Sequence, residues 1–334
     1  MSRRRRVPAW AAVMIVMLLV FWLLGAMLIP VGGGRTVTVR IPQGASAGAI
    51  GRILARDDVI RSSLGFRFLA RITGKGSRLK PGAYRLNSSM SPVEALTKIA
   101  NGDVSARWVT FPEGFTVKQI AERLAAEGLA NEDRFLELAL YGGSSFTTGF
   151  RHSGNSLEGY LFPDTYLIAP GTTEEAIIRE MLTCFERKVA SPMSSDIARS
   201  GMSLRDLVTM ASLIEREARV WKDRNLISGV LHNRLKRGMR LECDATVLYA
   251  LGSHKGRVLY SDLEVESAYN TYRNVGLPPG PIANPGMACI KAALHPARAD
   301  YLFYVARPDG SHIFSRTMAE HQRARQTARR EAGR

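Results

Sequence analysis

The chain has 334 residues, which is long enough for two or three compact units with cores of their own. It carries 46 Lys and Arg residues against 30 Asp and Glu residues, a balance that on its own would suit a nucleic-acid-binding protein. Its cysteines, Cys184, Cys243 and Cys289, are too few and too far apart for a disulfide scaffold, although one disulfide could form. No CxxC or HExxH motif occurs and the histidines show no ligand spacing, so we expect neither a metal site nor a cofactor.

The N-terminal residues predict a membrane anchor. A basic block, Arg3 to Arg6, precedes residues 7–34, which carry no charge. We expect residues 9–30 to form a transmembrane helix after a cytoplasmic tail, residues 1–8, because positive charge marks the cytoplasmic side. The rest of the chain would then lie in the periplasm, outside a bacterial inner (cytoplasmic) membrane. A cleavable signal peptide is the alternative, but this apolar run is longer than the usual core of about 7–15 residues.

The positive charge of the exported part suits anionic lipid or acidic cell-wall polymer better than DNA. We therefore expect no nucleic-acid partner.

An internal repeat follows the anchor. Residues 37–55 align with residues 107–125 at a constant offset, so that Pro42 matches Pro112 and Gly44 matches Gly114. Each copy predicts a short strand, a Pro-x-Gly turn, a Ser or Thr N-cap and an amphipathic helix. A second helix and a closing strand are expected after each copy. This pattern predicts two α+β modules, residues 31–103 and 104–170, and by itself says nothing about their ligand.

The segment 203–218, SLRDLVTMASLIEREA, predicts an amphipathic helix. At about 100° per residue, Glu215 lies in line with the apolar stripe, whereas Glu217 lies on the opposite face with Asp206. Burial would raise the pKa of Glu215, and a carboxylic acid that holds its proton near neutral pH can cleave a glycosidic bond by general-acid catalysis. The alternatives are that a buried arginine neutralises Glu215 or that Glu215 lies at the rim.

A second helix, 223–237, and the loop-rich residues 241–286 complete the predicted site. Asn233 and Arg234 are expected to form one wall of a cleft with Glu215. The later residues are rich in Tyr, Asn, Thr and Pro, which suits a saccharide cleft, although the Pro-Pro-Gly-Pro run could be only a stiff connector. The candidate substrate-binding residues are Asn233, Asp244, Thr246, Tyr269, Asn270, Tyr272 and Asn284.

Several blocks in a fixed order carry a resemblance to a known family. They are LEGYLFPDTY (157–166), ASLIEREA (211–218), NRL-x-x-GM-x-L (233–241), DATVLYALG (244–252), AYNTY (268–272), GLPPGPI (276–282), Ala-Leu-His-Pro (293–296) and YLFYVA (301–306). The chain resembles the YceG-like endolytic murein transglycosylases from its N-terminal anchor to about residue 322.

The resemblance implies an α+β protein of the inner membrane, with LysM-like modules and a mainly helical, lysozyme-like catalytic domain. That domain would span residues 171–322, before a basic tail, 323–334. The implied activity is endolytic cleavage of the MurNAc–GlcNAc β-1,4 bond in peptidoglycan glycan strands, leaving 1,6-anhydro-MurNAc ends. The family's catalytic acid carries over onto Glu215, and Tyr269 and Asn270 match a substrate-positioning motif. Peptidoglycan synthases are the implied protein partners.

One departure and two alternatives accompany this resemblance. The family commonly has Asp-Pro-Thr where this chain has Asp244-Ala245-Thr246. Asp244 is the one further acid expected to converge on the site, and a second carboxylate there would favour a muramidase-type hydrolase. A non-catalytic, membrane-anchored protein that binds the cell wall through its modules is the other alternative.

Overall fold

A computed structural model describes residues 29–152, 154–252 and 258–333, together with four isolated residues nearer the N-terminus. The predicted tail and most of the predicted anchor, residues 9–30, lie outside the described residues. Within the described part, no helix combines the length and the apolar character needed to cross a bilayer. The described chain forms two compact units, which we treat separately: the residues up to Val109 with Thr165–Pro170, and Thr110–Asp164 with Gly171–Arg334.

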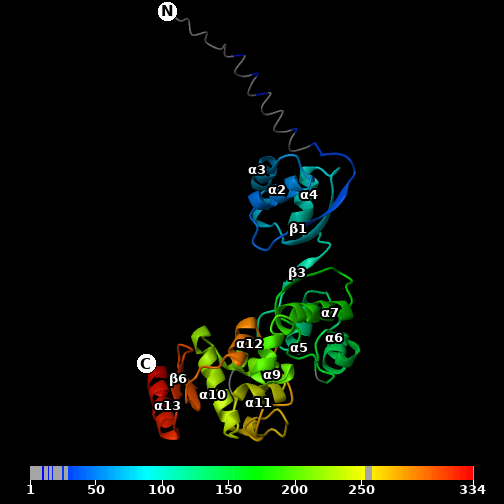
Figure 1. Ribbon diagram of the computed structural model, residues 1–334. Coiled ribbons are helices and arrows are strands. Elements are labelled where there is room, and N and C mark those ends of the chain that lie inside the picture. Colours follow the sequence, from blue (N-terminus) through cyan, green and yellow to red (C-terminus); the bar gives the residue numbers. More distant parts are fainter. Residues whose placement is uncertain are drawn as a thin grey trace, which may run out of the picture. The chain divides into compact units, whose positions relative to one another are not determined.

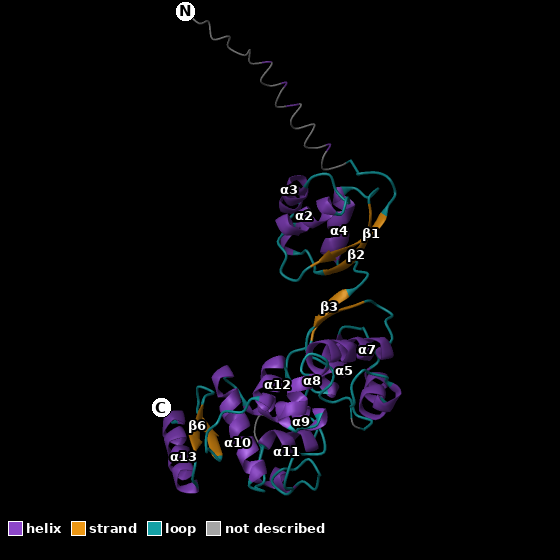
Figure 2. Cartoon of the chain, in the orientation of Figure 1, coloured by secondary structure: helices purple, strands orange, loops and turns teal. Residues whose placement is uncertain are grey.

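The first unit is a two-stranded antiparallel sheet with helices (Figures 1 and 2). Its elements are β1 (Thr36–Ile41), α2 (Ala47–Arg56), α3 (Ser63–Ile72), the 3₁₀ turn η1 (Lys75–Ser77), β2 (Gly82–Asn87) and α4 (Pro92–Asn101). Strands β1 and β2 pair with Val39 opposite Tyr84. Alternate side chains of β1 and β2 and the apolar faces of α2, α3 and α4 form one core, which includes Ile50, Phe66 and Leu96. The predicted strand, N-cap and helix order of the first repeat copy is confirmed.

The second repeat copy has the same local elements. Strand β3 (Arg107–Thr110) pairs with β4 (Thr165–Ile168), and α5 (Val117–Ala126) begins after its N-cap Thr116, whose side chain accepts from the Gln119 amide at 3.2 Å. The predicted module 104–170 does not form one compact unit, however. Its strands lie mainly in the first unit, and its helices lie in the second.

The second unit is mainly helical, with one small hairpin near its C-terminal end. Its elements are α5, α6 (Glu132–Leu136), the π turn η2 (Glu137–Tyr141), η3 (Gly143–Ser145), α7 (Glu174–Phe185), the π turn η4 (Glu186–Ala190), α8 (Ser194–Ser200), α9 (Leu204–Glu217), η5 (Trp221–Asp223), α10 (Arg224–Lys236), α11 (Asp244–Ala250), η6 (Tyr260–Glu264), α12 (Met287–Leu294), β5 (Phe303–Ala306), β6 (His312–Ser315) and α13 (Met318–Ala332). The mixed helix-and-strand class predicted for the chain is confirmed.

Helix α9 is the central element of this unit and packs against α10, α11 and α12 (Figure 2). The Ser203 side chain caps its N-terminus by accepting from the Asp206 amide at 3.1 Å. All residues from Leu207 to Ile214 are buried, which means that neighbours surround the helix on every side over these turns. The predicted amphipathic helix is confirmed, and of its predicted wet face Arg205, Asp206 and Arg216 are exposed whereas Glu217 is partly buried.

The sequence-based expectations for the last third of the chain need two changes. Residues 241–286, expected as loops, include helix α11 and the 3₁₀ turn η6, and helix α12 begins directly after them. Helix α13 runs through most of the predicted basic tail, where its apolar residues Ala324 and Ala328 are buried. The three cysteines are buried.

Candidate active site

A cavity of about 870 Å³ lies in the second unit at the C-terminal end of α9. Its walls come from α9, α10, α11, the hairpin β5–β6 and α13. The charged and hydrogen-bonding side chains that line it include Glu217, Arg234, Glu242, Asp244, Tyr272, Tyr304, His312 and Arg325. A cavity with carboxylates, cations and aromatic rings on its walls matches the chemistry of a saccharide site.

Glu217 is the last residue of α9 and is partly buried at this cavity. The Tyr304 hydroxyl donates a hydrogen bond to Glu217 Oε2 at 3.1 Å, and the Ala245 backbone amide donates to the same carboxyl group. Burial, and to a smaller extent the charge of Asp244, raises the pKa of Glu217 to about 7, although the hydrogen bond from Tyr304 lowers it. The expectation that Glu217 points outward into solvent is therefore wrong, because strand β5 and helix α11 cover this face of α9.

Asp244 lies at the same cavity as the first residue of α11. The Tyr272 hydroxyl donates to Asp244 Oδ1 at 2.6 Å, so the loop after η6 holds this carboxylate in place. Because Asp244 begins α11, the Ala245 amide has no partner within the helix and is free to donate to Glu217. Asp244 is expected from the sequence beside Glu215, whereas in the structure it lines the same cavity as Glu217.

Arg234 of α10 forms hydrogen bonds to two other segments that line the cavity. Its Nε donates to the Leu302 carbonyl at 2.7 Å, and its Nη1 donates to the Leu241 carbonyl at 2.9 Å and to Glu242 Oε2 at 3.0 Å. The arginine is buried and also lies over the ring of Phe303, 5.2 Å from its centroid. One guanidinium thus fixes the start of β5 and the segment before α11 relative to α10.

A buried hydrogen-bonded pair, Asp223 and His312, packs against Tyr304. The His312 backbone amide and Nδ1 both lie within 2.9 Å of Asp223 Oδ2. The His312 ring meets the Tyr304 ring edge to face, with centroids 5.5 Å apart. Asp223 therefore fixes His312, and His312 restricts the ring whose hydroxyl contacts Glu217.

Glu215, two residues earlier, has different surroundings. It is partly buried, its Oε2 accepts from the Gly286 amide at 2.9 Å, and it is absent from the described lining of the large cavity. The Glu113 carboxyl lies against the same glycine, since a Cβ added at Gly286 would be 1.9 Å from the Glu113 carboxyl carbon. Burial, followed by the charge of Glu215, raises the pKa of Glu113. Glu215 thus joins α9 to the start of α12.

Glu158 is the centre of a second hydrogen-bond network beside the site. It is 3% exposed, and its carboxyl oxygens accept from the Val117 amide at 3.1 and 3.2 Å and from Asn284 Nδ2 at 3.0 Å. Burial raises the pKa of Glu158 to about 8. This network joins the start of α5 to the segment before α12. Glu158 also lines a cavity of about 190 Å³, which shares Arg216, Ala245 and Leu248 with the large one.

Comparisons with known proteins agree on one family. A sequence model of the YceG-like family matches residues 39–327. The chain is 39% identical over 308 residues to the endolytic murein transglycosylase of Bacillus subtilis (strain 168), covering 87% of this chain and 84% of that protein. This chain belongs to the YceG-like family.

Two further relatives support membership in the YceG-like family. The endolytic murein transglycosylase of Streptococcus pneumoniae serotype 2 (strain D39 / NCTC 7466) is 33% identical over 319 residues, which cover 86% of this chain and 58% of that protein. The 2.6 Å crystal structure of a yceG-like protein from Listeria monocytogenes is 35% identical, with a TM-score of 0.61 over 86% of this chain and 98% of that one.

Most of the predicted substrate-binding residues of this YceG-like chain have other roles in the structure. Thr246, Asn270 and Asn284 are fully buried, and their side chains form hydrogen bonds within the protein. Asn233 donates to the carbonyls of Ala299 and Tyr301 at 2.7 and 2.9 Å. The expectation that these four side chains meet substrate is not met by the geometry, because their polar atoms already hold loops together.

Tyr269 is partly buried and packs on the ring of Tyr249 at 5.0 Å, close to the smaller cavity that Tyr249 lines. Asp244 and Tyr272 are the two predicted binding residues at the large cavity.

Sequence reasoning missed Glu217 and Tyr304 as site residues. The periodicity of α9 describes only the helix's own faces, and the cover over Glu217 comes from α11 and β5, later in the chain. A signal did exist, since Tyr304 stands in the YLFYVA block and Glu217 in the ASLIEREA block.

Proposed function

We propose that this chain is an endolytic murein transglycosylase with Glu217 as general acid and then general base. The bond cleaved would be the MurNAc–GlcNAc β-1,4 bond, and the product would carry a 1,6-anhydro-MurNAc end. The printed names of the bacillar and streptococcal relatives support the activity. The observation that carries the assignment of the acid is a half-buried carboxyl group that accepts from the Tyr304 hydroxyl on the wall of a cavity of about 870 Å³, where burial raises its pKa to about 7.

Glu215, which the helical pattern selects as the acid, remains an untested prediction that the geometry does not favour. One of its carboxyl oxygens accepts from the Gly286 amide at 2.9 Å, and its neighbour Glu113 occupies the space beside that amide. These contacts hold the Glu215 carboxyl group against the start of α12, whereas a general acid has to face the space that the substrate enters. We assign Glu215 the role of positioning α9.

The mechanism needs one carboxyl group. Protonated Glu217 donates its proton to the bridging oxygen as the glycosidic bond breaks through an oxocarbenium-like transition state. Ionised Glu217 then takes the proton from the C6 hydroxyl of the same MurNAc residue while that oxygen forms a bond to C1, which closes the anhydro ring. The Tyr304 hydroxyl and the Ala245 amide both donate to the carboxylate and so stabilise it between the two steps.

Asp244 supports one rival reaction. Because it lies at the same cavity, it could act as the base for a water molecule, and the enzyme would then be a muramidase-type hydrolase. The Tyr272 hydroxyl, 2.6 Å from Asp244 Oδ1, occupies one of its oxygens. We favour the lytic route because both named relatives are transglycosylases.

Mass spectrometry of the products separates the two reactions. The full chain in detergent is incubated with glycan strands at neutral pH. Anhydro-terminated fragments, lighter by one water than hydrolysis products, are expected. Reducing ends would support the hydrolase, and uncleaved strands with a folded protein would support a non-catalytic binding protein.

We further propose that residues 9–30 anchor the protein in the bacterial inner membrane, with the two described units in the periplasm. The order β1–α2–α3–β2 supports a LysM-like module in the first unit. Peptidoglycan synthases are the protein partners that this proposal implies. Fusion of a periplasm-active reporter after the last residue tests the orientation, and no reporter activity would contradict it.

A further inference from the structure

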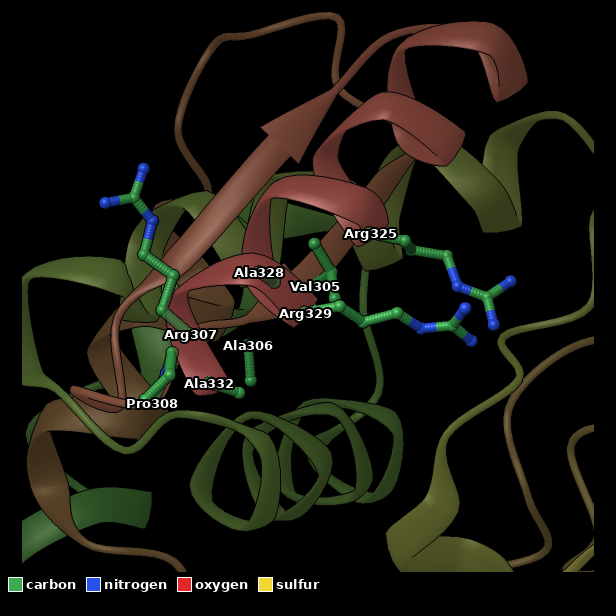
Figure 3. Close-up of a pocket in the computed structure, with 8 residues that line it drawn as sticks. All are labelled: Val305, Ala306, Arg307, Pro308, Arg325, Ala328, Arg329 and Ala332. Carbon is green, nitrogen blue, oxygen red and sulfur yellow. The ribbon is translucent and has the colours of Figure 1, made fainter. Parts of the chain in front are cut away.

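A basic groove lies between α13 and the hairpin β5–β6 (Figure 3). Its volume is about 360 Å³. Its floor consists of small apolar residues, among them Val305, Ala306 and Ala328, and its rim carries Arg325 and Arg329. We call these five residues the arginine groove.

The arginine groove is a neighbour of the cavity that contains Glu217. Val305, Ala306 and Arg325 line both. For a chain molecule bound at Glu217, the groove is therefore an adjacent surface on which a branch could bind.

Arg325 and Arg329 are arranged to receive an anion. They are four residues apart on α13, both are exposed, and their side chains extend side by side in Figure 3. Among the residues described, neither forms an ion pair, whereas Arg307 on the opposite side lies 3.8 Å from Glu331. Like charges four residues apart destabilise a helix, and a bound anion would remove that repulsion.

We propose that the arginine groove binds the acidic peptide side branches of the glycan strand. This inference rests on the proposed function, because peptidoglycan is the substrate that carries such branches on its muramic acid residues. Two guanidinium groups match the carboxylates of the peptide. The small apolar floor leaves room for the methyl groups of its alanine residues. The groove makes this enzyme select strands whose peptides are still attached.

The test compares two substrates with two variants of the full chain, reconstituted in nanodiscs of neutral phosphatidylcholine. The substrates are glycan strands with peptides and strands stripped of peptides by an amidase. For the wild type, we expect a KM about fivefold lower for the peptide-bearing strands, as about two exposed charge-assisted contacts would give. In the double variant Arg325→Gln/Arg329→Gln, the KM for peptide-bearing strands should rise to that for stripped strands. Because Arg325 also lines the cavity at Glu217, the single variant Arg329→Gln should change the KM in the same direction and leave cleavage of stripped strands unchanged.

The matched control is Arg323→Gln/Arg330→Gln, which removes the same charge from the same helix outside the groove. It should retain the wild-type preference. The proposal is overturned if the wild type shows no preference, if the groove variant keeps it, or if the control loses it equally. An effect that appears only in nanodiscs with anionic phosphatidylglycerol, and equally for both substrates, would show that the arginines bind lipid and would also overturn it.

A direct binding measurement separates this inference from the proposed function. Fluorescence anisotropy with a labelled, soluble muramyl pentapeptide requires no cleavage. The Arg325→Gln/Arg329→Gln chain should bind it about fivefold more weakly than the wild type does. Amidation of the peptide carboxylates should weaken wild-type binding by a similar factor. Equal binding by both proteins would contradict the groove assignment whether or not the chain cleaves glycan.

Discussion

The last turn of α9 places two glutamates in two regions that differ in what surrounds them. Around Glu215, a backbone amide and a second carboxyl group fill the space, and the contacts join α9 to α12. Around Glu217, a tyrosine hydroxyl and a backbone amide leave the carboxyl group open to a cavity of about 870 Å³. Two residues of the same type, in one helical turn, therefore have different environments: Glu215 is held by packing contacts, and Glu217 faces a cavity.

The difference shows that the direction of a side chain from its helix does not decide its environment. Elements later in the chain decide it: the start of α12 packs against Glu215, and α11 and β5 line a cavity at Glu217. Substitutions in the surroundings of either glutamate test this difference.

The largest effect is expected for Glu217→Gln. Glutamine has no acidic proton that it can transfer to the glycosidic oxygen, so cleavage should fall by at least about 10³-fold, while the melting temperature changes little. Release of glycan fragments under single-turnover conditions measures this loss. In the control variant Glu215→Gln, the amide oxygen can still accept from Gly286, and most of the activity should remain. The reverse ranking would restore Glu215 as the acid.

On the structural side, Glu158→Ala should lower the free energy of unfolding by about 2–4 kcal/mol, since it leaves the buried Val117 amide without its acceptor and removes one hydrogen bond of Asn284. Urea denaturation measures the change. Glu158→Gln, which keeps an acceptor, should cost less. If the free energy of unfolding fell by less than about 0.5 kcal/mol, as is usual for surface substitutions, the Glu158 network would not contribute to stability.

Glu158 also predicts a pH dependence of stability. Its pKa is raised in the folded chain to about 8, so the folded state holds this proton more tightly than the unfolded state. The resulting stabilisation is fully present below the unfolded pKa of about 4.3 and is lost as pH rises through about 8. Denaturation at several pH values should show this decline in the wild type and a weaker one in Glu158→Gln. Parallel curves would exclude Glu158 as its source.

Tyr304→Phe should reduce cleavage at pH 6 by about tenfold, because the carboxyl group of Glu217 loses the donor that orients it. The lost hydrogen bond favoured the ionised form, so the pKa of Glu217 should rise and the fall of activity with pH should move to higher pH. The pH profile of kcat/KM tests both parts. A lower activity with an unmoved profile would mean that Tyr304 acts only by packing.

The smallest effect is expected for Ala245→Pro, which introduces the residue that the YceG-like family commonly has at this position. Proline lacks the amide proton that Ala245 donates to Glu217, and the first turn of a helix accepts it. The pKa of Glu217 should rise by about half a unit to one unit, the usual size of one hydrogen-bond contribution. The pH profile should shift upward, and a downward shift would contradict the proposed contact.

Much of this fold could be predicted from local signals. The Ser and Thr caps at Ser46 and Thr116 identified two of the helices, and apolar periodicity identified the helix after Ser203. The roles of single polar residues could not be predicted in the same way. Asn284 lies far from Glu158 in the sequence and Tyr304 far from Glu217, and only tertiary packing brings these pairs together. Polar residues in loops resembled ligands of a saccharide, but buried loops need the same amides for their own backbone.

The central claim is that Glu217 holds a proton near neutral pH. Carbon-13 NMR of the glutamate carboxyl groups in the full chain measures this directly, with the Glu217 signal assigned by its absence in Glu217→Gln. The account predicts a titration midpoint of about 7 for this signal. A midpoint near the ordinary glutamate value of about 4.3 would contradict it.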